Sequence, residues 1–341
     1  MGKIATLSMA ALLLAVCART DGGGAPSAAA EPAPAAVPAP PAPVAAPAPQ
    51  TDTPGAKVAA SAPATAVAAR DADPALWLIK DGDTKVYLFG TVHLLRPGQT
   101  WFDEGVRAAY DRSSEVVLEV VQPEGAAAQA TQLRAARAAD GKPLRSKLSP
   151  ATRAKYEAAM KASGLPAEAV AQFDQFDPWF AALTLSLLPV LKAGYNPAAG
   201  AETVITAAAK GAGKPVGQLE TVEQQLGFFD ELDQASQIKY LEATLDSLDE
   251  TTQQLDQLAE AWAEGDTERL GALMNEALRA TPEVAKALLT DRNARWAQWI
   301  DDRMDRPGTV FVAVGAGHLA GADSVQAMLA KRKLRAERVR Y

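Results

Sequence analysis

The sequence is short of the residues that commonly serve as nucleophiles and proton acceptors. Among its 341 residues are one cysteine and two histidines. The cysteine, Cys17, lies close to the start of the chain, so the remainder has no thiol for a disulfide or a cysteine nucleophile. Any imidazole chemistry must come from His93 or His318.

The chain also lacks an excess of positive charge. Its formal net charge is −7 at pH 7, and its basic residues cluster only in the short tail 331-KRKLRAERVR-340. We therefore expect no nucleic-acid partner, because surfaces that bind nucleic acids are strongly basic. Two apolar stretches, 4–16 and 178–191, are each too short to span a bilayer as a helix.

Residues 1–18 have the layout of a secretory signal, with a lysine, the apolar stretch 4–16 and then small residues. The segment LLAVC resembles a bacterial lipoprotein acylation site, although Val16 stands where Gly, Ala or Ser is usual. Two outcomes are open: a lipid on Cys17 that attaches the protein to a membrane, or cleavage near Ala18 and release. In both cases we expect an exported protein, in the periplasm or attached to the envelope.

Residues 19–74 are predicted to form a disordered linker. Between positions 25 and 69 the chain is almost wholly Ala, Pro, Ser, Thr and Val, without an aromatic residue. Such a segment buries too little apolar surface to offset its ordering entropy, and its prolines favour extended conformations. The folded part is therefore expected at 75–341.

From residue 75 the pattern is that of an α/β protein, with strand-like apolar runs, a DGDT hairpin signal and Ala-rich amphipathic helices. The expected strands are 76–80, 85–90, 115–120, 215–220, 309–315 and 334–340. The expected helices are 103–113, capped by Asp103, and 124–139, 149–163, 166–174, 178–191, 201–210, 222–231, 234–264, 266–279, 283–303 and 321–330. This order predicts a central mixed, partly parallel sheet with a large helical insertion at about 124–303.

Both histidines follow a glycine at the end of an apolar run. In 86-VYLFGTVHLL-95 and 311-FVAVGAGHLAG-321, Gly90 and Gly315 each precede a histidine by three positions. Glycine there lets the backbone turn sharply and approach a ligand. Ligands of open α/β sheets bind at the carboxyl ends of the strands, so neighbouring strands would bring His93 and His318 together. The alternative is that each is a satisfied histidine of the core.

Three glutamates are candidate partners of the two imidazoles. Glu119 lies in the buried run VVLEV, where a carboxylate is costly unless it is paired or bound to a metal. Glu220 ends the short strand PVGQLE, and Glu202 opens the helix after AGYNPAAG. The competing interpretations are a structural ion pair for Glu119 and helix capping for Glu220 and Glu202.

Several segments resemble, in order and spacing, the TraB/PrgY/GumN family over roughly residues 75–341: LFGTVHLL with VLEV, WFAALTLSLL, AGYNPAAGAE, KPVGQLETVEQQLGFFD, DRNARW and VAVGAGHLAG. That family is similar to the TIKI metalloproteases and, more remotely, to erythromycin-esterase and ChaN-like proteins, whose architecture the resemblance implies. Motif by motif, it implies functional residues at His93, His318, Glu119, Glu220, Arg292 and Asn293, with Glu202 where the family often has Asp.

The two groups of relatives imply different chemistry. Similarity to TIKI implies a divalent-metal hydrolase, with manganese or cobalt the usual ion and zinc a further option. Similarity to the esterases implies a histidine and glutamate pair that activates water without a metal. A third alternative, from the TraB and PrgY members, is a non-catalytic module that binds or sequesters a peptide pheromone.

The leading hypothesis is a metal-dependent hydrolase of a peptide or of a small ester or amide. His93, His318 and Glu119 would hold one divalent ion, because imidazoles together with a carboxylate are a usual donor set. Glu220 would accept a proton from water, or would exchange this role with Glu119. Arg292 would stabilise the oxyanion or grip a substrate carboxylate, unless it forms an ordinary ion pair. The sequence carries no signal for an oligomeric state.

Overall fold

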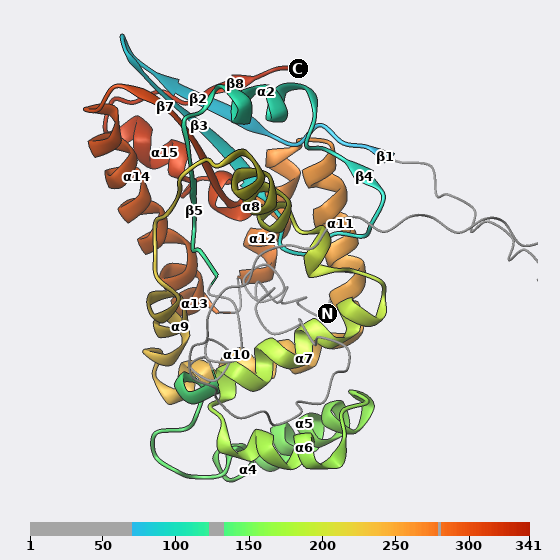
Figure 1. Cartoon of the computed structure of the whole chain (residues 1–341). Helices are drawn as coiled ribbons and strands as arrows, with labels where there is room; N and C mark the ends of the chain where they lie inside the picture. The colour runs from blue at the N-terminus through green and yellow to red at the C-terminus, as the bar shows by residue number, and fades with distance from the viewer. Residues whose placement is uncertain (1–69, 123–132, 279–280) are drawn as a thin grey trace, which may run out of the picture. The chain divides into compact units, whose positions relative to one another are not determined.

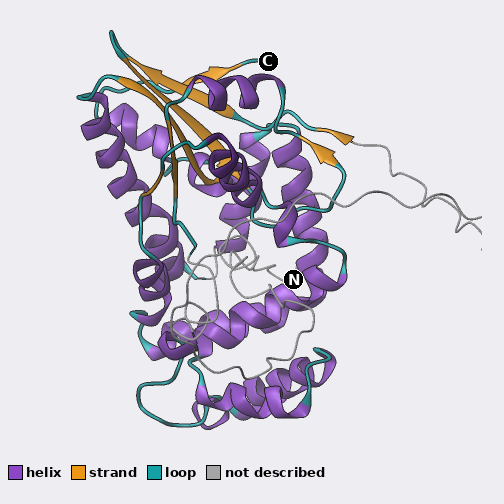
Figure 2. Cartoon of the chain, in the orientation of Figure 1, coloured by secondary structure: helices purple, strands orange, loops and turns teal. Residues whose placement is uncertain are grey.

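The computed structural model describes residues 70–122, 133–278 and 281–341. They form a mixed α/β fold around a six-stranded sheet, which confirms the predicted fold class (Figures 1 and 2). The strand order is β6-β5-β7-β3-β2-β8; β6, β5, β7 and β3 are mutually parallel, and β2 is antiparallel to β3 and β8. The strands are β2 (Leu76–Lys80), β3 (Thr84–Thr91), β5 (Glu115–Leu118), β6 (Val216–Gln218), β7 (Gly308–Gly315) and β8 (Glu337–Val339).

The predicted hairpin and the predicted parallel strands are both present. β2 and β3 join through a turn in which Asp81 Oδ1 accepts hydrogen bonds from the backbone N–H groups of Asp83 and Thr84. β7 comes late in the chain but lies between β5 and β3, with Leu118 opposite Ala313 and Thr91 opposite Gly315. The sheet is therefore completed in its middle by residues from near the carboxyl terminus.

A short parallel pair lies outside the main sheet: β1 (Arg70–Asp71) with β4 (Gln99–Thr100). Residues 70–74 belong to the predicted linker, but Ala72 and Pro74 are buried and Arg70 N–H donates to Gly98 O. The fold thus includes residues before position 75. The predicted signal and the rest of the predicted linker lie outside the described residues.

Helices cover both faces of the sheet and form the part remote from it (Figure 1). They are α2 (Glu104–Arg112), α4 (Leu144–Lys147), α5 (Pro150–Ala162), α6 (Ala167–Gln172), α7 (Pro178–Lys192), α8 (Ala201–Ala212), α9 (Val222–Asp230), α10 (Gln234–Ser247), α11 (Thr251–Ala263), α12 (Thr267–Leu278), α13 (Pro282–Ala285), α14 (Asp291–Met304) and α15 (Val325–Lys331). Short 3₁₀ turns are η1 (Phe173–Gln175), η2 (Pro197–Ala199), η3 (Leu248–Glu250) and η5 (Ala316–Leu319), and η4 (Lys286–Thr290) is a π-helical turn.

Alternating residues of the sheet contribute to two separate cores. Leu88 and Val312 belong to a cluster with Ile300, which lies on α14. Phe89 and Phe311 belong to a second cluster with Tyr110 on α2, and the rings of Tyr110 and Phe311 meet edge to face. The period of two along each strand therefore decides which layer of helices each side chain contacts.

Two predicted long helices are interrupted, and polar residues account for the first break. The stretch 234–264 divides into α10 and α11 at η3, where the hydroxyl groups of Ser247 and Thr251 bond to backbone carbonyls of the preceding turn. Such bonds compete with the regular helical pattern. The stretch 283–303 divides into α13, the π-helical turn η4 and α14.

Smaller differences concern helix ends. Asp103 occupies the N-cap position of α2 but its side chain makes no capping hydrogen bond. The predicted helix 321–330 begins only at Val325, after the turn η5. The predicted helix 124–139 lies mostly outside the described residues; positions 133–135 are helical.

The apolar segment predicted as a buried helix is α7, which continues through Pro189 to Lys192 and is mostly buried. In the part of the chain that the structure describes, no helix is both long and apolar enough to cross a membrane.

Trp262 on α11 links the helical part to the strand that carries the first motif. Its indole Nε1–H donates to the carbonyl oxygen of Gly90 at 2.7 Å. The ring also meets Trp101 edge to face, with centroids 5.8 Å apart. One buried side chain thus fixes α11 against the end of β3.

Replacing Trp262 by Phe should lower the free energy of unfolding by about 1–3 kcal/mol, because the substitution removes a buried hydrogen-bond donor. Urea denaturation followed by circular dichroism would measure the change. Trp299→Phe is the control: Trp299 is half-buried on α14, and its substitution should cost less than about 1 kcal/mol. Equal losses in both variants would show that the bond to Gly90 does not stabilise the fold.

Candidate active site

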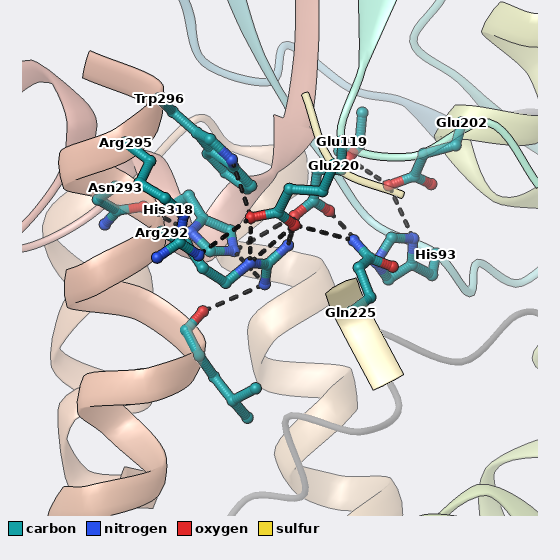
Figure 3. Close-up of polar contacts among 12 residues, drawn as sticks. His93, Glu119, Glu202, Glu220, Gln225, Arg292, Asn293, Arg295, Trp296 and His318 are labelled. Atoms are coloured by element: carbon teal, nitrogen blue, oxygen red, sulfur yellow. Dashed lines mark hydrogen bonds and ion pairs between the residues drawn. The ribbon is translucent and has the colours of Figure 1, made fainter. Parts of the chain in front are cut away.

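Four neighbouring parallel strands each deliver a polar residue to the same edge of the sheet (Figure 3). His93 follows β3, Glu119 follows β5, Glu220 follows β6 and His318 follows β7. Two histidines more than 200 positions apart were expected to meet if β3 and β7 were neighbours. The two strands do pair with each other. Glu202 from α8 and Arg292 from α14 complete the group (Figure 3).

Gly90 and Gly315 differ in how closely other atoms approach them. A Cβ atom on Gly90 would lie 3.1 Å from the Cα of Ala316, so glycine lets the chain after β7 pass close to β3. A Cβ atom on Gly315 would lie 3.5 Å from Glu119 Oε2 and from the ring of His318, which is ordinary contact. The close approach of Ala316 therefore favours glycine at position 90, whereas Gly315 faces the site without being crowded.

His93 lies between two carboxylates. Its Nδ1 is 2.8 Å from Glu202 Oε1, and its Nε2 is 3.9 Å from Glu119 Oε2. The same Glu202 oxygen accepts a short hydrogen bond from the hydroxyl of Thr91, the last residue of β3. The side chains of His93 and Glu202 are 13% and 19% exposed, so this is the part of the site nearest to solvent.

Gly200 allows α8 to bring Glu202 within reach of His93. The segments on either side run together, since Ala201 N–H donates to Val92 O at 2.9 Å. A Cβ atom on Gly200 would lie 2.2 Å from the carbonyl oxygen of His93. Only glycine fits at this contact without displacement of the backbone.

Arg292 holds the inner part of the site together from a position without solvent exposure. Its Nε donates to both oxygens of Glu220, and its Nη2 donates to Glu220 Oε2 at 2.8 Å and to Glu119 Oε1 at 2.6 Å. Its Nη1 reaches Leu288 O in the π-helical turn and His318 Nε2, both at 3.1 Å. All five N–H groups of Arg292 are engaged, so it positions other residues and has no donor left for a substrate.

Glu220 faces Arg292 and does not cap the helix that follows. Trp296 Nε1–H also donates to Glu220 Oε1 at 3.0 Å, and Gln225 Nε2 lies 3.4 Å from Oε2. The start of α9 is closed by a capping box, in which Thr221 accepts from Gln224 N–H and the Gln224 side chain accepts from Thr221 N–H. The capping alternative for Glu220 is therefore wrong.

His318 is buried and has partners at both ring nitrogens. Arg292 Nη1 can only donate, so His318 Nε2 accepts, and Nδ1 donates to Asn293 Oδ1 at 2.6 Å. Asn293 is held by a bond from its own Nδ2 to Asp323 O. Burial, followed by the charges of Arg292 and His93, lowers the pKa of His318 well below its usual value, so the ring stays neutral.

The charges of His93, Glu119 and Glu202 shift one another's pKa values. Burial lowers the pKa of His93, but the charge and hydrogen bond of Glu202 and the charge of Glu119 outweigh it and raise that pKa overall. Burial raises the pKa of Glu119 despite the opposing charges of Arg292 and His93. Burial would also raise the pKa of Glu202, yet His93 and the bond from Thr91 lower it overall. The site thus has an excess of carboxylates that protons or a cation would neutralise.

The donor atoms of His93, Glu119 and Glu202 lie within 4.8 Å of one another, so the group could hold one divalent ion after a small movement of the side chains. Two metal bonds of about 2.1 Å can bridge up to about 4.2 Å, and His93 Nε2 and Glu119 Oε2 are 3.9 Å apart. Imidazole and carboxylate groups are usual donors to divalent metal ions. We expected His318 as the second imidazole ligand, but its Nε2 already accepts from Arg292, and Glu202 occupies the place nearest His93.

Sequence reasoning brought together the correct strand ends but missed several residues that organise them. Thr91, Gly200 and Trp296 were not singled out, although Thr91 lies within the first motif and Gly200 within AGYNPAAGAE. Arg295 was missed too: its guanidinium stacks on Phe228, 5.1 Å from the ring centroid, and lies 3.6 Å from Glu220. A search for small and hydroxyl residues inside the motifs could have found the first two.

Replacing Gly200 by Ala should destabilise the fold by about 1–3 kcal/mol, because the new methyl group would overlap the carbonyl of His93. Gly211 is the matched control, since it lies on the same helix and a Cβ atom there would have no neighbour within 4 Å. Gly211→Ala should stabilise the protein by about 0.4–1 kcal/mol. Urea unfolding of both variants tests this difference in sign, and a stable Gly200→Ala protein would contradict it.

Replacing Arg292 by Met should cost about 3–5 kcal/mol of stability, because Glu119 and Glu220 would remain buried without a cation. Arg295→Met on the same helix is the control; its side chain is 51% exposed, and we expect a loss below about 1 kcal/mol. Thermal and urea unfolding would measure both. Similar small losses would mean that Arg292 does not organise the edge.

The comparisons with known proteins identify the family of the chain. Searches of curated proteins and of solved structures each gave no match. The model of the TraB/PrgY/gumN family matches residues 75–338, a range that contains both histidine motifs and every side chain described above. On the strength of this match over most of its length, the chain belongs to the TraB/PrgY/gumN family.

Proposed function

We propose that this protein is a hydrolase that activates water between His93 and Glu119 for attack on a carbonyl carbon. The observation that carries the proposal is the gap of 3.9 Å between His93 Nε2 and Glu119 Oε2, beside the carboxylate of Glu202. The gap lies at the carboxyl edge of parallel strands, where α/β proteins place their ligands.

The carboxylate that faces the gap is Glu119. Of the two carboxylates that we considered, Glu220 has both oxygens bound by Arg292 and Trp296. Glu119 uses Oε1 for Arg292 and directs Oε2 towards His93. Burial raises the pKa of Glu119, so an ion bound there would have to compete with a proton for this carboxylate. Arg292 keeps this carboxylate in place and does not touch the substrate.

In this proposal His93 Nε2 and Glu119 Oε2 would hold a divalent ion, and Glu202, the third residue of the group, would remain hydrogen-bonded to His93 Nδ1. The resemblance of the two Gly-x-x-His motifs to those of the TIKI metalloproteases supports manganese or cobalt. When bound, such an ion would polarise the carbonyl and lower the pKa of the water. The proposed substrates are peptides or small esters and amides, and the proposed location is the periplasm or the envelope.

A second candidate is the same hydrolysis without a metal. One observation favours it: Glu202 Oε1 is hydrogen-bonded to His93 Nδ1 at 2.8 Å, which is the arrangement of a histidine base oriented by a carboxylate. In this version Nε2 of His93 would accept the proton of the water.

Metal analysis and turnover of the purified full chain distinguish these candidates. We expect about one manganese, cobalt or zinc ion per chain, and cleavage of members of a peptide and ester library that a chelator abolishes and added Mn²⁺ restores. His93→Ala and Glu119→Gln should each lower turnover by about 10²–10⁴-fold, because both side chains act directly on the water or on the ion that activates it. Both variants should also lose the ion.

Glu115→Gln is the matched control, because Glu115 lies at the opposite end of β5 and pairs with Arg303. It should keep wild-type turnover. Turnover that survives the chelator but not His93→Ala would support the metal-free candidate. Full turnover in His93→Ala would exclude both, and tight peptide binding without cleavage would favour a sequestering module.

A further inference from the structure

The hydroxyl of Thr91 and the imidazole of His93 both bond to the same oxygen of Glu202. Thr91 is fully buried at the end of β3, two residues before His93. Glu202 reaches the same point from the first turn of α8. Two side chains from one segment therefore converge on one carboxylate oxygen of Glu202, which comes from a distant segment, as the right-hand part of Figure 3 shows for Glu202 and His93.

The direction of each bond follows from the chemistry of the groups. An ionised carboxylate has no proton, so both Thr91 Oγ1 and His93 Nδ1 must donate to Glu202. The amino-terminal position of Glu202 on α8 favours its ionised form through the helix dipole. A neutral His93 is then protonated at Nδ1, and its Nε2 lone pair is directed towards Glu119.

We propose that Thr91 and Glu202 are positioning residues that fix His93 as the Nδ1–H tautomer and so direct Nε2 into the gap beside Glu119. Thr91 matters because Glu202 has a flexible, partly exposed side chain that one hydrogen bond would leave free to rotate. A β-branched residue at the end of a buried strand has few rotamers, so it holds Oε1 at a fixed point.

His318 supplies an internal comparison within the same site. Its Nδ1 also donates, to Asn293 Oδ1, and its Nε2 accepts from Arg292 and lies 3.3 Å from Glu119 Oε1. Both imidazoles are therefore turned the same way about Glu119. For His318 the orienting group is a neutral amide, so only His93 depends on Thr91 and Glu202.

The proposal explains why His93 would be competent in the hydrolysis proposed above, and in that sense rests on it. The tautomer itself does not require that reaction. It can be measured directly, because the chain has only two histidines and each gives its own pair of ring nitrogen signals.

The experiment is ¹⁵N NMR of the full chain labelled at histidine, at a pH where both rings are neutral, with His318→Gln used to assign the signals. We expect His93 to show a protonated Nδ1 and an unprotonated Nε2. Predominant protonation of His93 at Nε2 in the wild-type protein would overturn the proposal. This test needs no variant of Thr91 or Glu202. The signals of His318 report in the same spectrum whether the inner site is intact.

Thr91→Val, which keeps the shape and removes the hydroxyl, should lower the Nδ1–H fraction of His93, and Thr91→Ser should restore it. Thr84→Val is the matched control: Thr84 is buried on the same strand, with its hydroxyl bonded to Arg306 O far from the site. It should leave the spectrum unchanged. A wild-type spectrum in a folded Thr91→Val protein would exclude the role of Thr91.

Mn²⁺ binding by calorimetry provides the second readout. Loss of a group that orients a ligand typically weakens metal binding 10–100-fold, and we expect about tenfold for Thr91→Val. Thr91→Ser and Thr84→Val should stay near wild type. If the wild-type chain binds no Mn²⁺ but keeps the Nδ1–H tautomer, the metal-dependent function is rejected and the positioning role of Thr91 and Glu202 is upheld. If Thr91→Val binds Mn²⁺ as tightly as wild type, the positioning role has no effect on ion binding.

Discussion

The buried guanidinium of Arg292 is the interaction on which the sheet edge depends. Glu119, Glu220 and His318 arrive on three neighbouring strands, and Arg292 bonds to all three. Without a cation the two carboxylates would have to become protonated or move towards water, since an unpaired charge is costly in the interior. The electrostatics of the candidate site are thus part of what allows parallel strands to end so close together.

The helix that supplies Arg292 also builds the core. One turn further along α14, Trp296 contacts the ring of His318 at 4.3 Å between centroids and donates to Glu220, and Ile300 packs against the sheet. The π-helical turn η4 comes directly before α14, and its Leu288 carbonyl accepts from Arg292. Such turns alter the rotation of the residues that follow. Substitutions at the buried positions of α14 that face the site should therefore affect stability and site geometry together.

Much of the edge could be predicted from sequence because strands and motifs carry local signals. The run VVLEV marks a buried strand with a carboxylate at its end, and each Gly-x-x-His motif marks another. The side-chain directions beyond the strands could not be predicted. His318 lies on the 3₁₀ turn η5, whereas His93 lies on an irregular segment held by α8, so the same spacing yields two different environments.

The tertiary contacts of the site residues could not be predicted from the sequence either. From the sequence, Glu202 and Glu220 are equally good candidates for helix caps. The packing of α8 and α14 gives the two side chains different partners. Glu202 meets His93 because Gly200 allows a close backbone contact, and Glu220 meets Arg292 because Thr221 and Gln224 already close the helix start. Long-range contacts of this kind leave no periodic trace in the chain.

The central position of β7 means that the candidate site is assembled late in folding. β3 and β5 leave the ribosome early, but they become joined only when residues 308–315 insert between them. Contacts so distant in sequence are late and slow to form, because the chain must close a very long loop first. A nascent or truncated polypeptide without β7 would therefore lack the assembled candidate site.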